Sequence, residues 1–347
     1  AGISNLAPGA FIAVVILLPT TLFIGATFPF AVRILALEAM DAAPASARIY
    51  AWNTLGSIMG SIAAGFFLLP LLGFDGTLAT GVLINLLLAA TAALVLTQGR
   101  IARNLALLAA AGALLFLAVQ PDDPMKVLSR SALTGRHFEG ELEYLGVGRS
   151  ATVTLSRTPY SRRLATNGLP EASMQGPGSP PDRFHDARWL GLLPVLSRPD
   201  TSRVLIIGLG GGNTLGAIPE SVESIELIEL EPEVVIANRI VGADRLGGAP
   251  LDDPRLNLRI GDARGALMLS GRKYDAIISQ PSHPWTSGAS HLYTKEFFEM
   301  VSDRLESDGV FVQWIGLGFV DTNLLRSLVA TLADTFEHLL VISPGAS

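Results

Sequence analysis

Cysteine is absent from this 347-residue chain. Its absence excludes disulfide bonds, thiolate metal sites and cysteine nucleophiles, although it does not identify the cellular compartment. Charge is scarce as well, because only 16% of the residues are Asp, Glu, Lys or Arg, and the formal net charge is −6. Without a cluster of basic residues, nucleic acid is not expected as a partner.

Charge is scarcest before residue 120. The charged residues there are Arg33, Arg48, Arg100, Arg103, Glu38, Asp41 and Asp75. The mean hydropathy of +0.44 is too high for an ordinary soluble enzyme of this size. Four apolar segments, residues 9–32, 47–72, 77–97 and 101–119, approach the ~20 residues that cross a bilayer as a helix. We therefore expect a transmembrane helical domain of four spans over residues 1–122.

Glycine is plentiful, and four glycines gather at residues 208–212 within the stretch RVLIIGLGGGNTLGAIPESVESIELIELE, residues 203–231. The apolar, β-branched run 204–207 predicts a buried parallel strand. The glycines Gly208, Gly210, Gly211 and Gly212 predict a loop, and a helix should begin near residues 213–214. A second buried strand is expected over 225–228, ending at Glu229.

This order of strand, glycine loop, helix, strand and acid is typical of sites for adenosine-containing ligands. The glycines let the backbone approach the ligand, and the acid can accept hydrogen bonds from ribose hydroxyls. Asp262, after a further predicted strand at 256–260, could accept from the adenine amine. The spacing G-x-G-x-G differs from the dinucleotide pattern, so S-adenosylmethionine is favoured over NAD.

The remaining pattern predicts two more units. Alternating residues at 151–155 and 163–166, with turns at 158–161 and at Asn167-Gly168, indicate a small antiparallel β-subdomain within residues 123–175. Residues 176–347 read as a Rossmann-like α/β domain of the class I S-adenosylmethionine-dependent type, with a doubly wound sheet. Its other expected helices are 184–196, 294–305 and 321–334, and its other expected strands are 276–278, 310–314 and 338–342.

Several motifs together resemble one family. They are the glycine loop, Glu229, Asp262, YDAIIS, LYTKEFF and GVFVQW, preceded in the apolar part by GATFPF and YAWNTLGSIMGS. They are similar to the spermidine synthase family of aminopropyltransferases, in the branch fused to a membrane domain. The resemblance implies a transferase that uses decarboxylated S-adenosylmethionine, or S-adenosylmethionine itself, as co-substrate. It would alkylate an amine or polyamine and release methylthioadenosine, without a metal, and a homodimer is compatible with it.

The resemblance also implies roles for individual residues. Gly208, Gly210 and Gly212 would line the nucleoside pocket, Glu229 would hold the ribose, and Asp262 with Ala263 would hold the adenine. The segments NGLPE (167–171) and FHD (184–186) correspond to family motifs that contact the donor tail or the amine. The candidate substrate-binding residues are therefore Glu171, His185, Asp186 and Tyr293.

The chain departs from the family where the amine binds. Soluble members carry Asp at the position of Gly211 and two further Asp where this chain has Gln280 and His283. A polyamine is cationic near neutral pH and must lose a proton before its nitrogen attacks. Glutamine cannot accept that proton, whereas imidazole can. His283 is thus the candidate base and Gln280 would orient the acceptor, although His283 could equally be an incidental polar residue in a degenerate site.

Two other functions remain open. The chain could be an S-adenosylmethionine-dependent methyltransferase, or a non-catalytic nucleoside-binding module attached to a membrane domain.

Two arguments about the side of the membrane on which the α/β domain lies disagree. Four spans place all four arginines of the apolar part opposite the α/β domain, and the positive-inside rule would then put that domain outside the cytoplasm. Because S-adenosyl donors are made in the cytoplasm, we expect a multi-pass protein of the cell (inner) membrane with a cytoplasmic domain.

Overall fold

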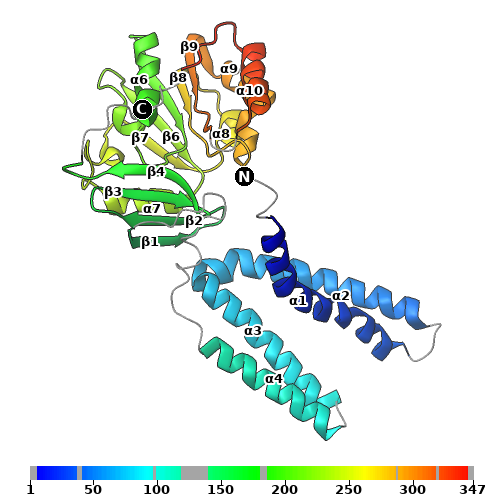
Figure 1. Ribbon diagram of the computed structural model, residues 1–347. Coiled ribbons are helices and arrows are strands. Elements are labelled where there is room, and N and C mark those ends of the chain that lie inside the picture. The colour runs from blue at the N-terminus through cyan, green and yellow to red at the C-terminus, as the bar shows by residue number, and fades with distance from the viewer. Residues whose placement is uncertain are drawn as a thin grey trace. The chain divides into compact units, whose positions relative to one another are not determined.

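The computed structural model describes residues 6–36, 41–96, 99–118, 140–179, 186–286, 288–317 and 320–342. Contacts divide the chain into two compact units, Ala1–Leu96 and Thr97–Ser347. Figure 1 shows that the first unit is helical and that the second contains both sheets. The two units are described separately below.

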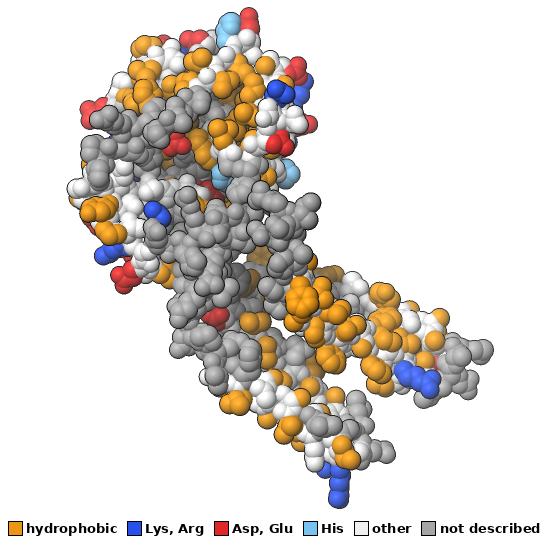
Figure 2. Space-filling view, in the orientation of Figure 1, with side chains coloured by type: hydrophobic (Ala, Val, Ile, Leu, Met, Phe, Trp, Pro, Cys, Tyr) orange, Lys and Arg blue, Asp and Glu red, His pale blue; other side chains and the backbone are white. Residues whose placement is uncertain are grey.

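The first unit consists of apolar helices. They are α1 (Leu6–Leu35), α2 (Ala42–Ala63), a π-helical turn η3 (Ala64–Leu68) and α3 (Leu69–Leu96). Helix α1 contacts α2, and α3 bends at Gly73, whose φ of +66° lies in the left-handed region. Large apolar side chains such as Phe23, Leu71 and Leu87 are exposed, and Figure 2 shows hydrophobic side chains over much of the described helical surface.

Three helical stretches are long and apolar enough to cross a membrane, by length and composition. They are Ala13–Leu35, Ala42–Gly73 and Asp75–Val95. The fourth predicted span corresponds to helix α4 (Arg100–Ala118), but its apolar part, Ala106–Leu115, is too short among the described residues to count as a span. The described residues thus contain three candidate spans where the sequence predicted four.

The second unit contains a small antiparallel sheet. Its strands are β1 (Glu141–Val147), β2 (Thr152–Arg157), β3 (Ser161–Thr166) and β4 (Leu169–Gln175), in the order β1-β2-β3-β4. The turn predicted at Asn167-Gly168 joins β3 to β4, and φ angles of +50° and +77° place both residues in the left-handed region, as tight two-residue hairpin turns favour. This sheet confirms the predicted β-hairpin pattern.

The larger sheet has five parallel strands. They are β5 (Arg203–Ile207), β6 (Ser224–Glu229), β7 (Leu256–Ile260), β8 (Tyr274–Ser279) and β9 (Leu305–Gln313), in the order β7-β6-β5-β8-β9. The helices are α6 (Asp186–Ser197), α7 (Pro232–Val241), α8 (Ala263–Leu269), α9 (Lys295–Asp303) and α10 (Thr322–Thr335). The expected doubly wound, Rossmann-like sheet is therefore present.

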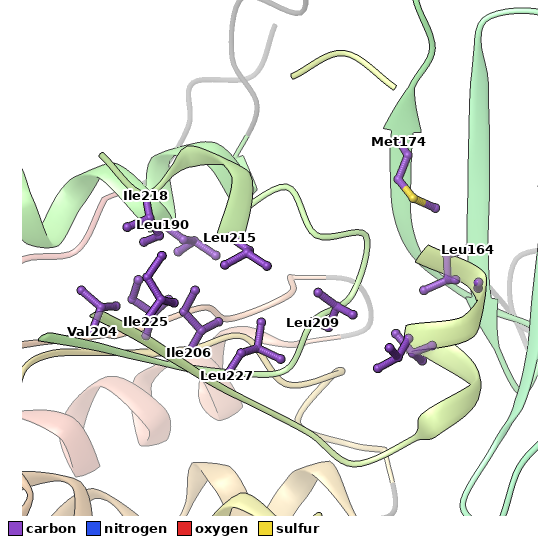
Figure 3. Packing of buried hydrophobic residues seen from close by; sticks show 14 of the residues in the cluster. Leu164, Met174, Leu190, Val204, Ile206, Leu209, Leu215, Ile218, Ile225 and Leu227 are labelled. Atoms are coloured by element: carbon purple, nitrogen blue, oxygen red, sulfur yellow. The ribbon is translucent and has the colours of Figure 1, made fainter. Parts of the chain in front are cut away.

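Each face of the parallel sheet is buried in a separate core. Successive residues of β5 alternate between them, with Ile206 in one core and Ile207 in the other, as the two-residue period of a strand requires. The first core joins β5, β6 and β8 to α6, α7 and the small sheet, and Figure 3 shows Leu164 and Met174 of that sheet in this cluster. The second core joins the strands to α8, α9 and α10. Burial on both faces explains the continuous apolar runs in these strands.

Two predictions about this domain are wrong, and one helix was missed. The helix expected near residues 213–214 is only a 3₁₀ turn, Leu215–Ala217, because Gly216 weakens a helix and Pro219 prevents its continuation. Residues 338–342 form no strand, and Leu340 in that segment is 80% exposed. Helix α7 was not predicted, although Pro232 at its first position and Glu233 in its first turn are regular start signals.

Glu231, just after β6, ties the small sheet to the parallel sheet. Its Oε2 accepts hydrogen bonds from the amide of Ser150 (3.0 Å), the hydroxyl of Ser150 (2.7 Å) and the amide of Ala151 (3.1 Å). The side chain is buried. A carboxylate that accepts several hydrogen bonds is a strong anchor, because each bond is charge-assisted.

We therefore expect Glu231→Ala to lower the free energy of unfolding by about 2 kcal/mol, because it removes charge-assisted hydrogen bonds and leaves two amides unpaired. Denaturant unfolding of the detergent-solubilised chain measures the difference. The exposed Glu223 supplies a matched control, since Glu223→Ala should change stability by no more than about 0.5 kcal/mol. Equal losses in the two variants would show that Glu231 does not anchor the small sheet.

Candidate functional site

The order of the strands predicts where a ligand binds. The chain begins the sheet at the central strand β5, passes to β6 and β7, and then returns to the other side of β5 at β8. The crevice beyond the carboxyl ends of the strands at such a switch point is the usual ligand site of open α/β sheets. Here the loops after β5 and β8 meet, because a Cβ added at Gly208 would lie 2.8 Å from the carbonyl oxygen of Gln280.

The glycine loop needs its glycines for conformation. Gly208, Gly210 and Gly212 have φ angles of +89°, +51° and +74°, which other residues rarely adopt. A Cβ built at Gly210 would approach only the Gln280 amide nitrogen, at 3.9 Å. As far as the described residues go, the space over the middle of the loop is therefore open, which a close-lying ligand requires.

Gly211 differs from the other loop glycines. Its φ is not positive, but a Cβ there would lie 2.8 Å from the Cβ of Ala172 and 3.2 Å from Cγ of Met174. Strand β4 therefore covers this side of the loop. An aspartate at this position, as in the soluble enzymes that the chain resembles, would not fit without a shift of β4.

Gln280 binds the glycine loop with both ends of its side-chain amide. Its Nε2 donates to the carbonyl oxygens of Gly208 (2.7 Å) and Leu209 (3.2 Å), and its Oε1 accepts from the hydroxyl of Thr214 (2.5 Å). Sequence reasoning assigned Gln280 to the acceptor. In the structure the amide instead forms hydrogen bonds with the loop and Thr214. Any contact between Gln280 and an acceptor would come in addition to these.

Two further side chains hold the rest of the loop. Asn238 Nδ2 donates to the carbonyl of Gly210 (2.8 Å), and Arg245 Nη1 donates to the carbonyl of Gly211 (2.6 Å). Burial, together with the nearby charge of Arg162, lowers the pKa of Arg245 to about 10. The sequence showed neither role, because nothing in its local pattern marks Asn238 or Arg245 as contacts of a loop more than 20 residues away.

Glu229 lies buried at the carboxyl end of β6, beside the glycine loop. Its Oε2 accepts from the amide of Leu209 (2.7 Å) and its Oε1 from the amide of Glu231 (2.9 Å). Burial raises the pKa of this carboxyl, while the backbone donors act in the opposite direction. The amides orient both oxygens, and each oxygen retains a lone pair for a ribose hydroxyl.

Asp262 and Ala263 begin helix α8, at the end of β7. The Asp262 carboxylate caps the helix by accepting from the amides of Arg264 (3.2 Å) and Gly265 (2.9 Å), and Ala263 is buried. The side chain is thus fixed at the edge of the crevice next to β6. This placement is consistent with the expected adenine contact.

The predicted amine-binding residues meet across the two sheets. Glu171 on β4 accepts with Oε1 from the hydroxyls of Thr166 (2.6 Å) and Ser282 (2.7 Å). The buried Tyr293 donates to the carbonyl oxygens of Ser282 (2.9 Å) and Trp314 (3.2 Å). Burial, and then the charge of Glu171, raises the pKa of the Tyr293 hydroxyl, so it remains a neutral donor.

The His283 ring packs against two tryptophans. Its ring stacks on Trp285 with centroids 5.2 Å apart, and a second indole, that of Trp314, lies 5.8 Å away. Nδ1 is buried without a hydrogen-bond partner among the described residues, and Gly316 leaves the ring its space, since a Cβ there would lie 2.5 Å from Nδ1.

Of the two other candidates, only Asp186 is described. It is the first residue of α6, and its Oδ2 lies 3.4 Å from the indole nitrogen of Trp314. His185 lies outside the described residues. The structure therefore forms two groups of side chains. Glu171, Ser282 and Tyr293 make up one, and Asp186, His283 and the two tryptophans make up the other. Trp314 contacts both groups. Thr166 and Ser282 were missed, since hydroxyl residues in strands and loops carry no distinctive signal.

Comparison with known proteins identifies relatives of this arrangement. Residues 184–341 match the spermine/spermidine synthase domain. Polyamine aminopropyltransferase 1 of Streptomyces coelicolor is 27% identical over 335 residues, which are 92% of this chain and 60% of that protein. The spermidine synthase of Solanum lycopersicum is 32% identical over 203 residues, or 58% of this chain and 55% of the relative. The chain thus spans less than two thirds of the length of these curated relatives.

A solved spermidine synthase structure is among those with a similar fold. It is a spermidine synthase in complex with the transition-state analogue AdoDATO, with 24% sequence identity and a TM-score of 0.50. The match covers 57% of this chain and 66% of that one. This likeness supports the Rossmann-like fold with its parallel sheet.

The loop contacts of Gln280 lead to a prediction. Gln280→Glu replaces the amide donor by a carboxylate oxygen that faces two carbonyl oxygens, so we expect a loss of about 2 kcal/mol or more in unfolding free energy. Thermal and denaturant unfolding measure it. Asn257→Asp on the exposed edge strand makes the same chemical change without a contact to lose. If Gln280→Glu unfolds like the wild type, the amide does not hold the loop.

Proposed function

We propose that this chain, whose residues 184–341 belong to the spermine/spermidine synthase family, transfers an aminopropyl group from decarboxylated S-adenosylmethionine to an amine. The observation that carries the proposal is the meeting of two half-sites at the switch point of the sheet. One is the glycine loop with Glu229, and the other is the Glu171–Ser282–Tyr293 group. The first suits a nucleoside and the second a cation.

The nucleoside half has the features that an adenosyl group requires. The positive φ angles require glycine, and among the described residues nothing crowds the space above Gly210. Glu229, oriented by two backbone amides, would accept from the ribose hydroxyls, and Asp262 with Ala263 would contact the adenine. Gln280 would act as a positioning residue, because its amide fixes the loop against β8.

In the proposed reaction the acceptor nitrogen attacks the aminopropyl carbon bound to the sulfonium. The carbon–nitrogen bond forms while the carbon–sulfur bond breaks, and the electron pair of that bond passes to sulfur, which leaves as the neutral thioether methylthioadenosine. The acceptor nitrogen is an ammonium near neutral pH and must lose a proton before it attacks, and His283 would accept that proton. Since Nδ1 is buried against Gly316, Nε2 is the ring nitrogen that would do so.

The membrane attachment belongs to the same proposal. Three helical stretches of the first unit are apolar and long enough to span a bilayer. The similarity to the Streptomyces protein covers 92% of this chain, so it extends beyond the α/β domain into the helical part. We infer a multi-pass membrane enzyme of the fused branch, with its α/β domain on the cytoplasmic side, where S-adenosyl donors are made.

Product analysis tests this function. The detergent-solubilised full chain, given decarboxylated S-adenosylmethionine and a set of amines, should release methylthioadenosine. His283→Ala should lower turnover by about 10²–10⁴-fold, the usual contribution of a general base, with nucleoside binding unchanged.

Other products would decide against the proposal. Release of S-adenosylhomocysteine from S-adenosylmethionine would indicate a methyltransferase. Tight nucleoside binding without any product, with every amine offered, would indicate a binding module. Full activity in His283→Ala would exclude the histidine as the base while leaving the transfer reaction itself supported.

A further inference from the structure

The glycine loop carries two successive backbone amides without a partner. Neither the Gly210 nor the Gly211 amide donates a hydrogen bond within the part of the chain that the structure describes. The carbonyl of Gly210 is held from behind by Asn238 on α7, at 2.8 Å. Because the N–H and C=O of a trans peptide point in opposite directions, the Gly211 N–H points away from Asn238. Successive free amides in a loop of alternating handedness are a common way to bind an anion.

A buried arginine lies behind the same amides. Arg245 is 6% exposed, and its Nη1 donates to the carbonyl of Gly211 at 2.6 Å. The other buried arginine of the described chain, Arg162, pairs with Glu143 and Asp244. Arg245 has no such ion pair among the described residues. Burial and the like charge of Arg162 lower its pKa to about 10, and its Nε has no hydrogen-bond partner there. A buried, unbalanced positive charge is unfavourable unless an anion comes near.

The loop has no acid that would repel an anion. A side chain at Gly211 would begin 2.8 Å from the Cβ of Ala172, so an acid there would require β4 to shift. Glu229, which borders the loop, has both carboxylate oxygens bonded to backbone amides at the end of β6. The electrostatic field at Gly210 and Gly211 is therefore set by their own amides and by Arg245.

The proposed pose of the nucleoside decides which part of the ligand meets these amides. Asp262, after β7, would hold the adenine, and Glu229, at the end of β6, would hold the ribose. The next strand of the sheet is β5, which leads into the glycine loop. The side chain on the sulfonium therefore continues over Gly210 and Gly211. In the decarboxylated donor that side chain ends in an ammonium alone, whereas S-adenosylmethionine carries a carboxylate as well.

We propose that the chain also accepts S-adenosylmethionine itself as donor, with its carboxylate at the Gly210 and Gly211 amides, and transfers the aminocarboxypropyl group. This inference rests on the proposed function and adds a second donor to it. The neutral acceptor nitrogen attacks the carbon of that group bound to sulfur. The carbon–nitrogen bond forms, the carbon–sulfur bond breaks, and its electron pair stays on sulfur. Methylthioadenosine leaves uncharged, and the positive charge passes to the nitrogen.

Product analysis tests the donor. The detergent-solubilised full chain, given S-adenosylmethionine and a set of amines, should release methylthioadenosine. Mass spectrometry should find the amine enlarged by an aminopropyl group that still carries its carboxyl group, and a reaction without amine corrects for spontaneous breakdown of the donor. Transfer from the decarboxylated donor alone would overturn the inference and leave the proposed function standing. Release of S-adenosylhomocysteine would also overturn it, because the methyl group would then be the one transferred.

Calorimetry with the two donors tests the role of Arg245, since they differ only by the carboxylate. Wild type should bind S-adenosylmethionine more tightly than the decarboxylated donor. Arg245→Met should reduce this ratio roughly tenfold, the order that Coulomb's law gives for a unit charge several ångströms away in a partly buried site. Arg245→Lys, which keeps the charge, should keep most of the ratio. Arg239→Met makes the same change at an exposed position of α7 and should leave the ratio unaltered.

The ratio separates a charge effect from a structural one, because a loosened loop would weaken both donors alike. An unchanged ratio in Arg245→Met would overturn the inference. If that variant does not fold in a melting curve, the wild-type ratio decides, and tighter binding of the decarboxylated donor would overturn the inference. If wild type transfers nothing from either donor, the proposed function fails, and the same wild-type ratio decides whether the loop binds a carboxylate.

Discussion

The hydrogen bonds from the Gln280 side-chain amide to the glycine loop are the contacts on which the site depends. The amide nitrogen satisfies the carbonyl oxygens of Gly208 and Leu209 while the amide oxygen accepts from Thr214. Asn238 and Arg245 satisfy the next two carbonyl oxygens. Because side chains behind the loop hold its carbonyl groups, the loop keeps a shape that three positive φ angles alone would leave adaptable.

The small sheet imposes the second constraint. Glu231 anchors it at Ser150 and Ala151, and Ala172 on β4 lies so close to Gly211 that a side chain at 211 would collide with it. An acidic side chain at position 211 would therefore require β4 to shift. The negative charge of the crevice comes instead from β4, through Glu171, and Ser282 links it to the end of β8. The position of β4 thus accounts both for the lack of an acid at position 211 and for the acid Glu171 that faces the crevice.

Much of the fold could be predicted because its strands are buried on both faces and read as apolar runs. The strand ending at Glu229 was found this way, whereas the turn at Asn167-Gly168 was found from its turn residues. Residues 338–342 carry the same apolar pattern yet form no strand, since pattern alone does not show whether a neighbouring edge pairs with them.

The nucleoside half of the site was likewise predicted from a local motif, whereas the side chains that hold the site in place were not. Asn238, Arg245 and Thr166 reach the site only through tertiary packing. Gln280 looked like a substitute for a lost acid, and only the structure shows that its amide is hydrogen-bonded to the loop.

Titration calorimetry of methylthioadenosine into the full chain and into Glu229→Ala and Glu229→Gln tests the account most directly. Saturable 1:1 binding to wild type, lost in Glu229→Ala and weakened in Glu229→Gln, is the predicted result. No binding to wild type, or equal binding to all three proteins, would contradict a nucleoside site at this crevice.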